Sequence, residues 1–116
     1  MIETAQAFGV DIGGSGIKAA PVAEPRLKIL TPEVSTPQAV AKIVKQQLDH
    51  FEVPESAPVG IAFPAPIKPG QKLDFMANLD QSWIGVDVTE VFSEACGRPV
   101  VVVNDADAAG LAEVQF

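Results

Sequence analysis

The sequence predicts an α/β domain built around a five-stranded mixed sheet. Residues 8–30 contain three short apolar runs separated by glycine- or proline-containing turns, which is typical of an antiparallel meander. Farther along, two segments with helical spacing of apolar residues alternate with two short apolar runs, which favours parallel strands with helices packed on the faces of the sheet. The 116 residues, 47% of them hydrophobic, suffice for one such domain with a buried core.

Residues 8–18 (FGVDIGGSGIK) predict a strand, a glycine-rich turn and the start of a second strand. Glycine lacks a Cβ and readily takes positive φ, so such a turn lets backbone N–H groups approach a phosphate closely. A carboxylate ahead of the turn can hold a metal ion, directly or through water, and a lysine behind it can meet phosphate charge. The candidate residues for binding a phosphate group are Asp11, Gly13, Gly14, Ser15, Gly16 and Lys18, with Asp11 also the candidate metal ligand.

Other glycine motifs differ in what must follow the turn. A dinucleotide-binding turn requires a helix immediately afterwards, but Pro21 and Pro25 stand where that helix would be, so residues 17–22 predict a strand instead. A Walker loop requires Gly-Lys-Ser/Thr, which the sequence lacks. An ordinary glycine hairpin with an exposed Asp11 and Lys18 remains an open alternative.

A strand and a helix come next. Residues 26–30 alternate in polarity between two prolines, which predicts the third strand of the meander. Apolar side chains at helical spacing then continue to Phe51, with Thr36 as the N-cap, Pro37 at the first helical position and Pro54 just beyond the end. This helix is predicted to cover one face of the sheet.

The central part of the chain combines a short strand with a polar loop. Residues 59–63 (VGIAF) predict a strand buried on both faces, and residues 64–66 (PAP) are either a pocket wall or a stiff connector. Residues 73–77 predict a further strand or extended segment. In the polar loop that follows, Asn78 offers both a donor and an acceptor, as sugar hydroxyls demand. Trp83 either stacks on a ligand or, as is commoner, pins the loop to the core.

The last predicted elements are a helix and a strongly β-branched strand. Residues 86–96 have helical spacing and are followed by Gly97, which is a typical helix stop. Residues 99–103 (PVVVV) predict a strand in the interior of the sheet.

A second chemical motif lies where that strand ends. Asn104 and Asp105 occupy the carboxyl end of the strand and the N-terminus of a helix predicted from Ala108, where side chains can point into a cleft. A carboxylate there can orient a substrate hydroxyl and accept its proton during phosphoryl transfer. The helix dipole and N–H donors keep such a carboxylate ionised, as a base requires. Asp105 as a general base and Asp105 as a helix cap are both open interpretations.

Composition excludes several functions. The net charge is −7, with 8 Lys and Arg against 15 Asp and Glu, which argues against a nucleic-acid-binding surface. A polyanionic ligand would need a local basic patch. Neither a secretory signal nor a membrane-spanning apolar run is apparent, so we expect a cytoplasmic protein that does not act on membranes. A single cysteine, Cys96, and a single histidine, His50, support neither a disulfide framework nor a structural zinc site.

Three ordered segments resemble the amino-terminal portion of ROK-family sugar kinases, which have the actin-like (ribonuclease H-like) ATPase fold. They are residues 8–18 (FGVDIGGSGIK), 77–85 (ANLDQSWIG) and 103–113 (VNDADAAGLAE). The polyphosphate-dependent glucokinase subgroup is the most similar in appearance. Three matches in order across nearly the whole chain are far more specific than any one of them.

The resemblance implies a function and roles for the candidate residues. It implies phosphoryl transfer from polyphosphate, ATP or both to the 6-hydroxyl of glucose, accompanied by Mg²⁺. Residues 11–18 would form the first phosphate motif, Asn78 and Asn104 would help hold the sugar, and Asp105 would be the general base. The family resemblance also implies a homodimeric parent enzyme.

In one respect the sequence departs from this family. Its members continue for at least as long again, with a second phosphate motif and further sugar-contacting residues. Residues 1–116 are therefore predicted to be the amino-terminal lobe of a two-lobed kinase, with little or no activity alone. Two alternative functions are a non-catalytic ROK-type sugar sensor and another phosphotransferase or ATPase of the same fold.

Overall fold

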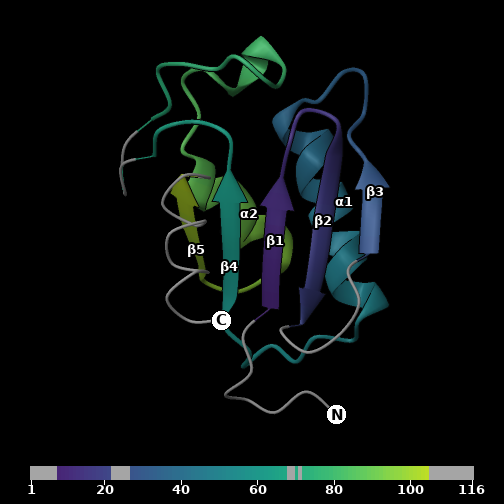
Figure 1. Cartoon of the computed structure of the whole chain (residues 1–116). Helices are drawn as coiled ribbons and strands as arrows, with labels where there is room; N and C mark the ends of the chain where they lie inside the picture. The colour runs from purple at the N-terminus through teal and green to yellow at the C-terminus, as the bar shows by residue number, and fades with distance from the viewer. Residues whose placement is uncertain (1–7, 22–26, 68–69, 71, 105–116) are drawn as a thin grey trace.

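The computed structural model describes residues 8–21, 27–67, 70 and 72–104, and its central feature is a five-stranded mixed sheet (Figure 1). The strand order across the sheet is β3-β2-β1-β4-β5. β2 pairs antiparallel with both β1 and β3, whereas β4 pairs parallel with both β1 and β5. The strands are β1 (Phe8–Ile12), β2 (Gly16–Pro21), β3 (Leu27–Leu30), β4 (Val59–Phe63) and β5 (Val100–Asn104). The predicted meander followed by parallel strands is confirmed.

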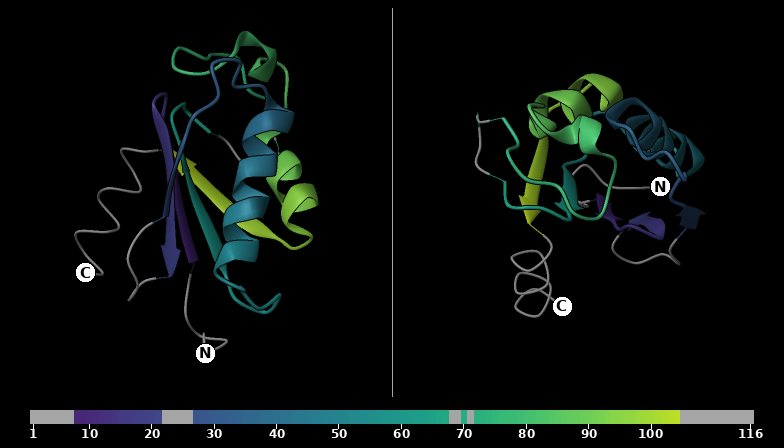
Figure 2. Two further views of the ribbon diagram at one scale, coloured as in Figure 1. Left: turned by 90° about the vertical axis from the view of Figure 1, so that its right-hand side faces the viewer. Right: turned by 90° about the horizontal axis from the view of Figure 1, so that it is seen from above.

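Two helices, α1 (Pro37–His50) and α2 (Val88–Cys96), pack side by side against the same face of the sheet (Figure 2). The predicted cap of α1 is confirmed, because the side chain of Thr36 accepts a hydrogen bond from the backbone N–H of Ala39 at 3.2 Å. No helix in the described part of the chain is long and apolar enough to cross a membrane.

A capping side chain and a glycine define the two ends of α2. The helix begins two residues later than residues 86–96 predicted, because the carboxylate of Asp87 accepts the N–H of Glu90 at 3.1 Å and so caps the first turn. It stops at Gly97, as predicted, with φ of 66°, a left-handed conformation that glycine adopts at little cost.

The core lies between the sheet and the two helices. In β1 the side chains of Phe8, Val10 and Ile12 are buried, while the alternate positions are exposed. At its centre three aromatic rings meet: the centroid of Phe63 lies 4.8 Å from that of Trp83, and the centroids of Trp83 and Phe92 are 5.7 Å apart. Because Trp83 is fully buried, it pins its loop to the core and does not stack on a ligand.

The face of the sheet opposite α1 and α2, which no helix of the described residues covers and which we call the open face, bears on two predictions. Residues 59–63 were expected to be buried on both faces, yet Gly60 is exposed, and on the same face Val101 of β5 is 65% exposed. In addition, β5 is an edge strand of the described sheet. A β-branched run fits any pleated strand that buries one side, so the pattern does not reveal how many layers cover the sheet.

Residues 73–77 were predicted to be a strand or an extended segment; they form no strand, and Leu73 attaches them to residues 85–86. The backbone N–H of Leu73 donates to the carbonyl of Val86 at 2.8 Å, and its own carbonyl accepts from Gly85 at 2.7 Å. This pairing closes a long loop that contains the short 3₁₀ helix η1 (Gln81–Trp83). Four of the five residues are apolar, but within the described residues no neighbouring strand continues the pairing.

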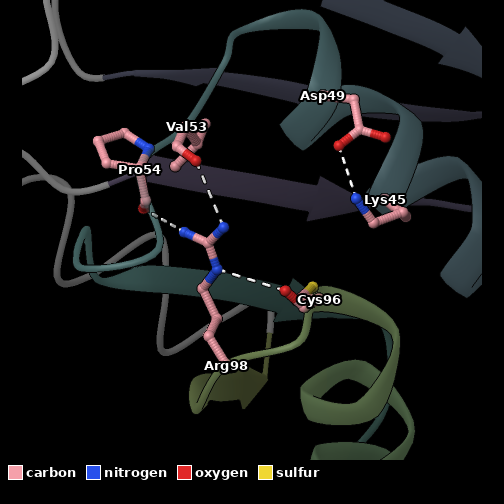
Figure 3. A network of polar contacts seen from close by, with 6 residues as sticks. All are labelled: Lys45, Asp49, Val53, Pro54, Cys96 and Arg98. Carbon is pink, nitrogen blue, oxygen red and sulfur yellow. Dashed lines mark hydrogen bonds and ion pairs between the residues drawn. The ribbon is translucent and has the colours of Figure 1, made fainter.

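Arg98 ties the beginning of β5 to the connection between α1 and β4 (Figure 3). Its guanidinium donates to the backbone carbonyls of Val53, at 3.3 Å, Pro54, and Cys96, at 3.4 Å. The planar guanidinium suits this task because its N–H donors point in several directions at once. On α1 nearby, Lys45 and Asp49 form an exposed ion pair at 2.6 Å.

Candidate functional site

Three of the predicted site segments meet at one edge of the sheet. Because β1, β4 and β5 run parallel, their carboxyl ends share that edge, which is uppermost in Figure 1. Residues 13–16, which we call the glycine turn, follow β1, residues 64–66 follow β4, and Asn104 ends β5. Neighbouring strands are about 4.8 Å apart, so Asn104 lies roughly 10 Å across the sheet from the end of β1. A sugar and a phosphoryl group fit within such a span.

The glycine turn is closed by its own backbone. The N–H of Gly13 donates to the carbonyl of Gly16 at 3.0 Å. Among the described glycines, positive φ occurs only at Gly70, Gly85 and Gly97. The turn therefore does not use the positive φ that its glycines permit, so we looked to the surroundings of each glycine for a reason.

A close neighbour explains one of these glycines, Gly14. A Cβ on Gly14 would lie 3.1 Å from the backbone oxygen of Asn78 and 3.7 Å from its Cβ. A Cβ on Gly16 would lie 2.5 Å from Cε of Lys28, but that atom is near the end of a flexible side chain that can move aside. Glycine at position 14 thus allows the loop that carries Asn78 to rest directly on the turn. The structure brings these two predicted segments together, although they are far apart in sequence.

Asp11 and Lys18 flank the turn on the open face. They are cross-strand partners in the β1–β2 register, and both are exposed. No ion pair in the described residues includes either of them. Both charges are therefore accessible from solvent at the mouth of the turn.

Asp11 fits a Mg²⁺ ion that arrives with a phosphorylated substrate. Within the described residues, no group of three or more His, Cys, Asp or Glu side chains is placed to hold a metal ion. Mg²⁺ in phosphoryl-transfer sites is commonly held by one or two carboxylates together with waters and substrate phosphates. One accessible carboxylate beside the glycine turn meets that requirement.

Thr31, which follows β3, was not recognised from the sequence. Its hydroxyl donates to the carbonyl of Gly13 at 2.6 Å, and its backbone N–H donates to the carbonyl of Ser15 at 3.4 Å. Both bonds attach the glycine turn to the end of β3. The only local signal was a hydroxyl residue at the end of a strand, which is too common to indicate a site.

Ser35 was also missed, and it holds the polar loop. It is buried, its Oγ accepts the backbone N–H of Asp80 at 3.0 Å, and its carbonyl accepts Nε1 of the Trp83 indole at 2.8 Å. Residues 31–35 therefore contact the glycine turn at one end and the Asn78 loop at the other.

The loop is further ordered by hydrogen bonds of its own. Asp80 accepts both the hydroxyl and the backbone N–H of Ser82, the latter at 2.9 Å, and these two bonds lower the pKa of the Asp80 carboxyl from its ordinary value. Nε2 of Gln81 donates to the carbonyl of Met76 at 2.8 Å. Asn78 stays exposed between these fixed points, so its amide is available to a ligand.

Asn104 is the last described residue of the second motif. It is half-buried at the end of β5, opposite Phe63 in the β4–β5 register. Asp105 lies outside the described residues, so its role as base or cap stays a prediction.

Known proteins match this chain along nearly its whole length. The sequence profile of the ROK family matches residues 7–116. A polyphosphate glucokinase from Mycobacterium tuberculosis is 39% identical over 117 residues, which cover 94% of this chain and 43% of that protein. The chain thus spans less than half the length of this curated relative.

Solved structures agree with the sequence matches. An inorganic polyphosphate/ATP-glucomannokinase from Arthrobacter sp. strain KM superposes with a TM-score of 0.86 at 38% identity, covering 97% of this chain and 49% of that one. A ROK family glucokinase from Streptomyces griseus, in complex with glucose and AMPPNP, gives a TM-score of 0.80 at 28% identity, covering 97% of this chain and 37% of that one. These are sugar kinases of the actin-like ATPase fold, so the predicted fold class is confirmed.

Proposed function

The chain belongs to the ROK family, and from this premise we propose that it is the amino-terminal lobe of a two-lobed glucokinase. The enzyme transfers a phosphoryl group from polyphosphate or ATP to the 6-hydroxyl of glucose. In support, the curated relative is named polyphosphate glucokinase, and the Streptomyces griseus structure holds glucose and a nucleotide.

The single observation that carries this proposal is the contact between Gly14 and Asn78. A turn suited to phosphate and a polar residue suited to sugar hydroxyls touch at the carboxyl edge of the sheet. In open α/β sheets, ligands bind at this edge. A kinase needs both substrates close together there, whereas a bare ATPase has no use for a sugar-binding amide beside its phosphate turn.

In this proposal, residues of the chain have the following roles. Backbone N–H groups of Gly14 and Ser15, together with Lys18, hold the terminal phosphates of the donor, in a turn that the Gly13 N–H closes through its bond to Gly16. Asn78 and Asn104 orient the sugar, and Asp105 accepts the proton of the attacking hydroxyl. Most of the rate enhancement in phosphoryl transfer comes from such positioning and charge stabilisation.

Asp11 is the residue of this chain that would hold Mg²⁺, directly or through water. When bound, the ion neutralises charge on the transferred phosphoryl group. The proposal further includes a cytoplasmic homodimer with no nucleic-acid or membrane partner, and little turnover by residues 1–116 alone, because the other wall of the cleft comes from elsewhere.

The test is glucose 6-phosphate formation by the full-length polypeptide, with polyphosphate and ATP offered separately in the presence of Mg²⁺. We expect product with at least one donor, and no phosphorylation of acetate offered as an alternative acceptor. A folded protein that forms no glucose 6-phosphate would contradict the proposal. In the same assay Asp105→Asn is expected to lower turnover about 10²-fold, whereas turnover near that of the wild type would make Asp105 a helix cap.

A further inference from the structure

Two lysines face each other beside the glycine turn. Lys18 of β2 and Lys28 of β3 are direct partners in the antiparallel register, and both are exposed on the open face. The Cβ atoms of such partners are about 5 Å apart, and like charges placed directly opposite each other destabilise a sheet. With Asp11, the partner of Lys18 on β1, they form one row across three strands.

The side chain of Lys28 runs diagonally toward the turn. A Cβ built on Gly16 would lie 2.5 Å from Cε of Lys28 and 3.5 Å from both its Cγ and its Cδ. The aliphatic part of the lysine therefore lies over Gly16, which is both the last residue of the turn and the first of β2. Since Nζ is one bond beyond Cε, the ammonium group lies on the side of the Lys18–Lys28 pair that faces the glycine turn.

Within the described residues, the two lysines face a single carboxylate in their row, Asp11, which lies opposite Lys18 and forms no ion pair with it. The ion pair found there joins Lys45 to Asp49 on α1, and none includes Lys18 or Lys28. In a chain with a net charge of −7, two adjacent unpaired cations next to a phosphate-binding turn form the local basic patch that a polyanion requires.

We propose that Lys28 binds the phosphoryl donor together with Lys18 and favours linear polyphosphate over ATP. This inference rests on the proposed function, because it takes the glycine turn as the site of the terminal phosphates. Every phosphate unit of polyphosphate carries negative charge, so a polyphosphate that extends beyond the glycine turn can contact both ammonium groups in succession. ATP offers three phosphates and then a nucleoside, which gains less from the second cation.

The first experiment compares donor kinetics in the full-length polypeptide. Lys28→Met keeps the aliphatic stem over Gly16 and removes the charge. We expect the KM for polyphosphate to rise about tenfold or more, with kcat and the KM for glucose little changed and the KM for ATP raised much less. Lys28→Arg should restore polyphosphate affinity. Lys42→Met, an exposed lysine of α1 on the other layer, is the matched control.

A second experiment does not depend on catalysis. Tripolyphosphate binding is measured by calorimetry without sugar, for wild type, Lys28→Met and Lys42→Met, at low and at moderate salt. We expect Lys28→Met alone to weaken binding and to reduce its salt dependence.

The outcomes separate the two proposals. Glucose phosphorylation with an unchanged KM for polyphosphate in Lys28→Met would overturn the role of Lys28 and leave the glucokinase proposal standing. An equal loss with ATP and polyphosphate would overturn the donor preference. If no donor supports phosphorylation but Lys28→Met still weakens tripolyphosphate binding, the glucokinase proposal fails and the anion site stands. Tripolyphosphate binding that is absent, or equal in all variants, would overturn the site.

Discussion

At Gly14, the space that a side chain would occupy is already filled by the backbone of Asn78, 3.1 Å from where a Cβ would lie. The sequence predicted a glycine turn but not the reason for its glycines, because that reason is a residue 64 positions later in the chain. A contact between distant segments leaves no local pattern. For the same reason Thr31 and Ser35, whose roles are hydrogen bonds to distant backbone atoms, were not predicted.

Replacing Gly14 should therefore affect the sugar as well as the donor. In Gly14→Ala the new methyl group pushes the Asn78 loop away by a few tenths of an ångström, so we expect the KM for glucose to rise roughly 3- to 10-fold. Steady-state kinetics on the full-length polypeptide provide the measurement. Gly9→Ala is the control, because a Cβ there meets nothing within 4 Å. Equal KM values for the two variants would show that the contact is unimportant.

Asp80 makes the order of the polar loop depend on pH. Its pKa is lowered from 3.8 by the hydrogen bonds from Ser82. A carboxyl group with a depressed pKa in the folded state adds stability above its unfolded pKa, and that contribution disappears as the pH falls through the folded value. We expect wild type to exceed Asp80→Asn in urea stability at neutral pH, and this difference to shrink as the pH falls below 3.8. A difference independent of pH would assign the effect of Asp80 to something other than its charge.

At the scale of elements, local periodicity predicted the two helices and five strands because each buries a single face. It failed where the outcome depends on neighbours. Residues 73–77 are largely apolar, but within the described residues their backbone pairs with another segment only through Leu73. The valines of β5 were placed in the sheet interior, although β5 lies at an edge of the described sheet. Periodicity also does not predict the hydrogen bonds that join connecting segments, and those of Arg98 are the clearest example.

Arg98 should matter for stability far more than its exposed neighbours do. Arg98→Ala removes a guanidinium that satisfies three backbone carbonyls across two connections, so we expect the free energy of unfolding to fall by about 2 kcal/mol. Lys45→Met, which breaks the exposed pair with Asp49, should cost about 0.5 kcal/mol or less. Urea denaturation of both variants measures the two changes in the free energy of unfolding. Similar losses in the two would contradict the role given to Arg98.

At the scale of the whole molecule, the sheet places donor and sugar residues at the edge shared by β1, β4 and β5. The acidic chain as a whole is unsuited to a polyanion, and the exception is the basic pair formed by Lys18 and Lys28 at one corner of that edge. Family resemblance predicted the fold and assigned roles to Asn78, Asn104 and Asp105. The register that sets Lys28 beside Lys18 emerges only when the strands are assembled.

The most direct test of the account concerns the shared site of sugar and phosphate. Asn78→Ala in the full-length polypeptide removes the amide beside the glycine turn and leaves the buried anchors of its loop intact. We expect kcat/KM for glucose to fall about tenfold or more, while the KM for the donor at saturating glucose stays near that of the wild type. Gln46→Ala, on the exposed side of α1, should change neither value. Wild-type kinetics for glucose in Asn78→Ala would contradict the proposed site.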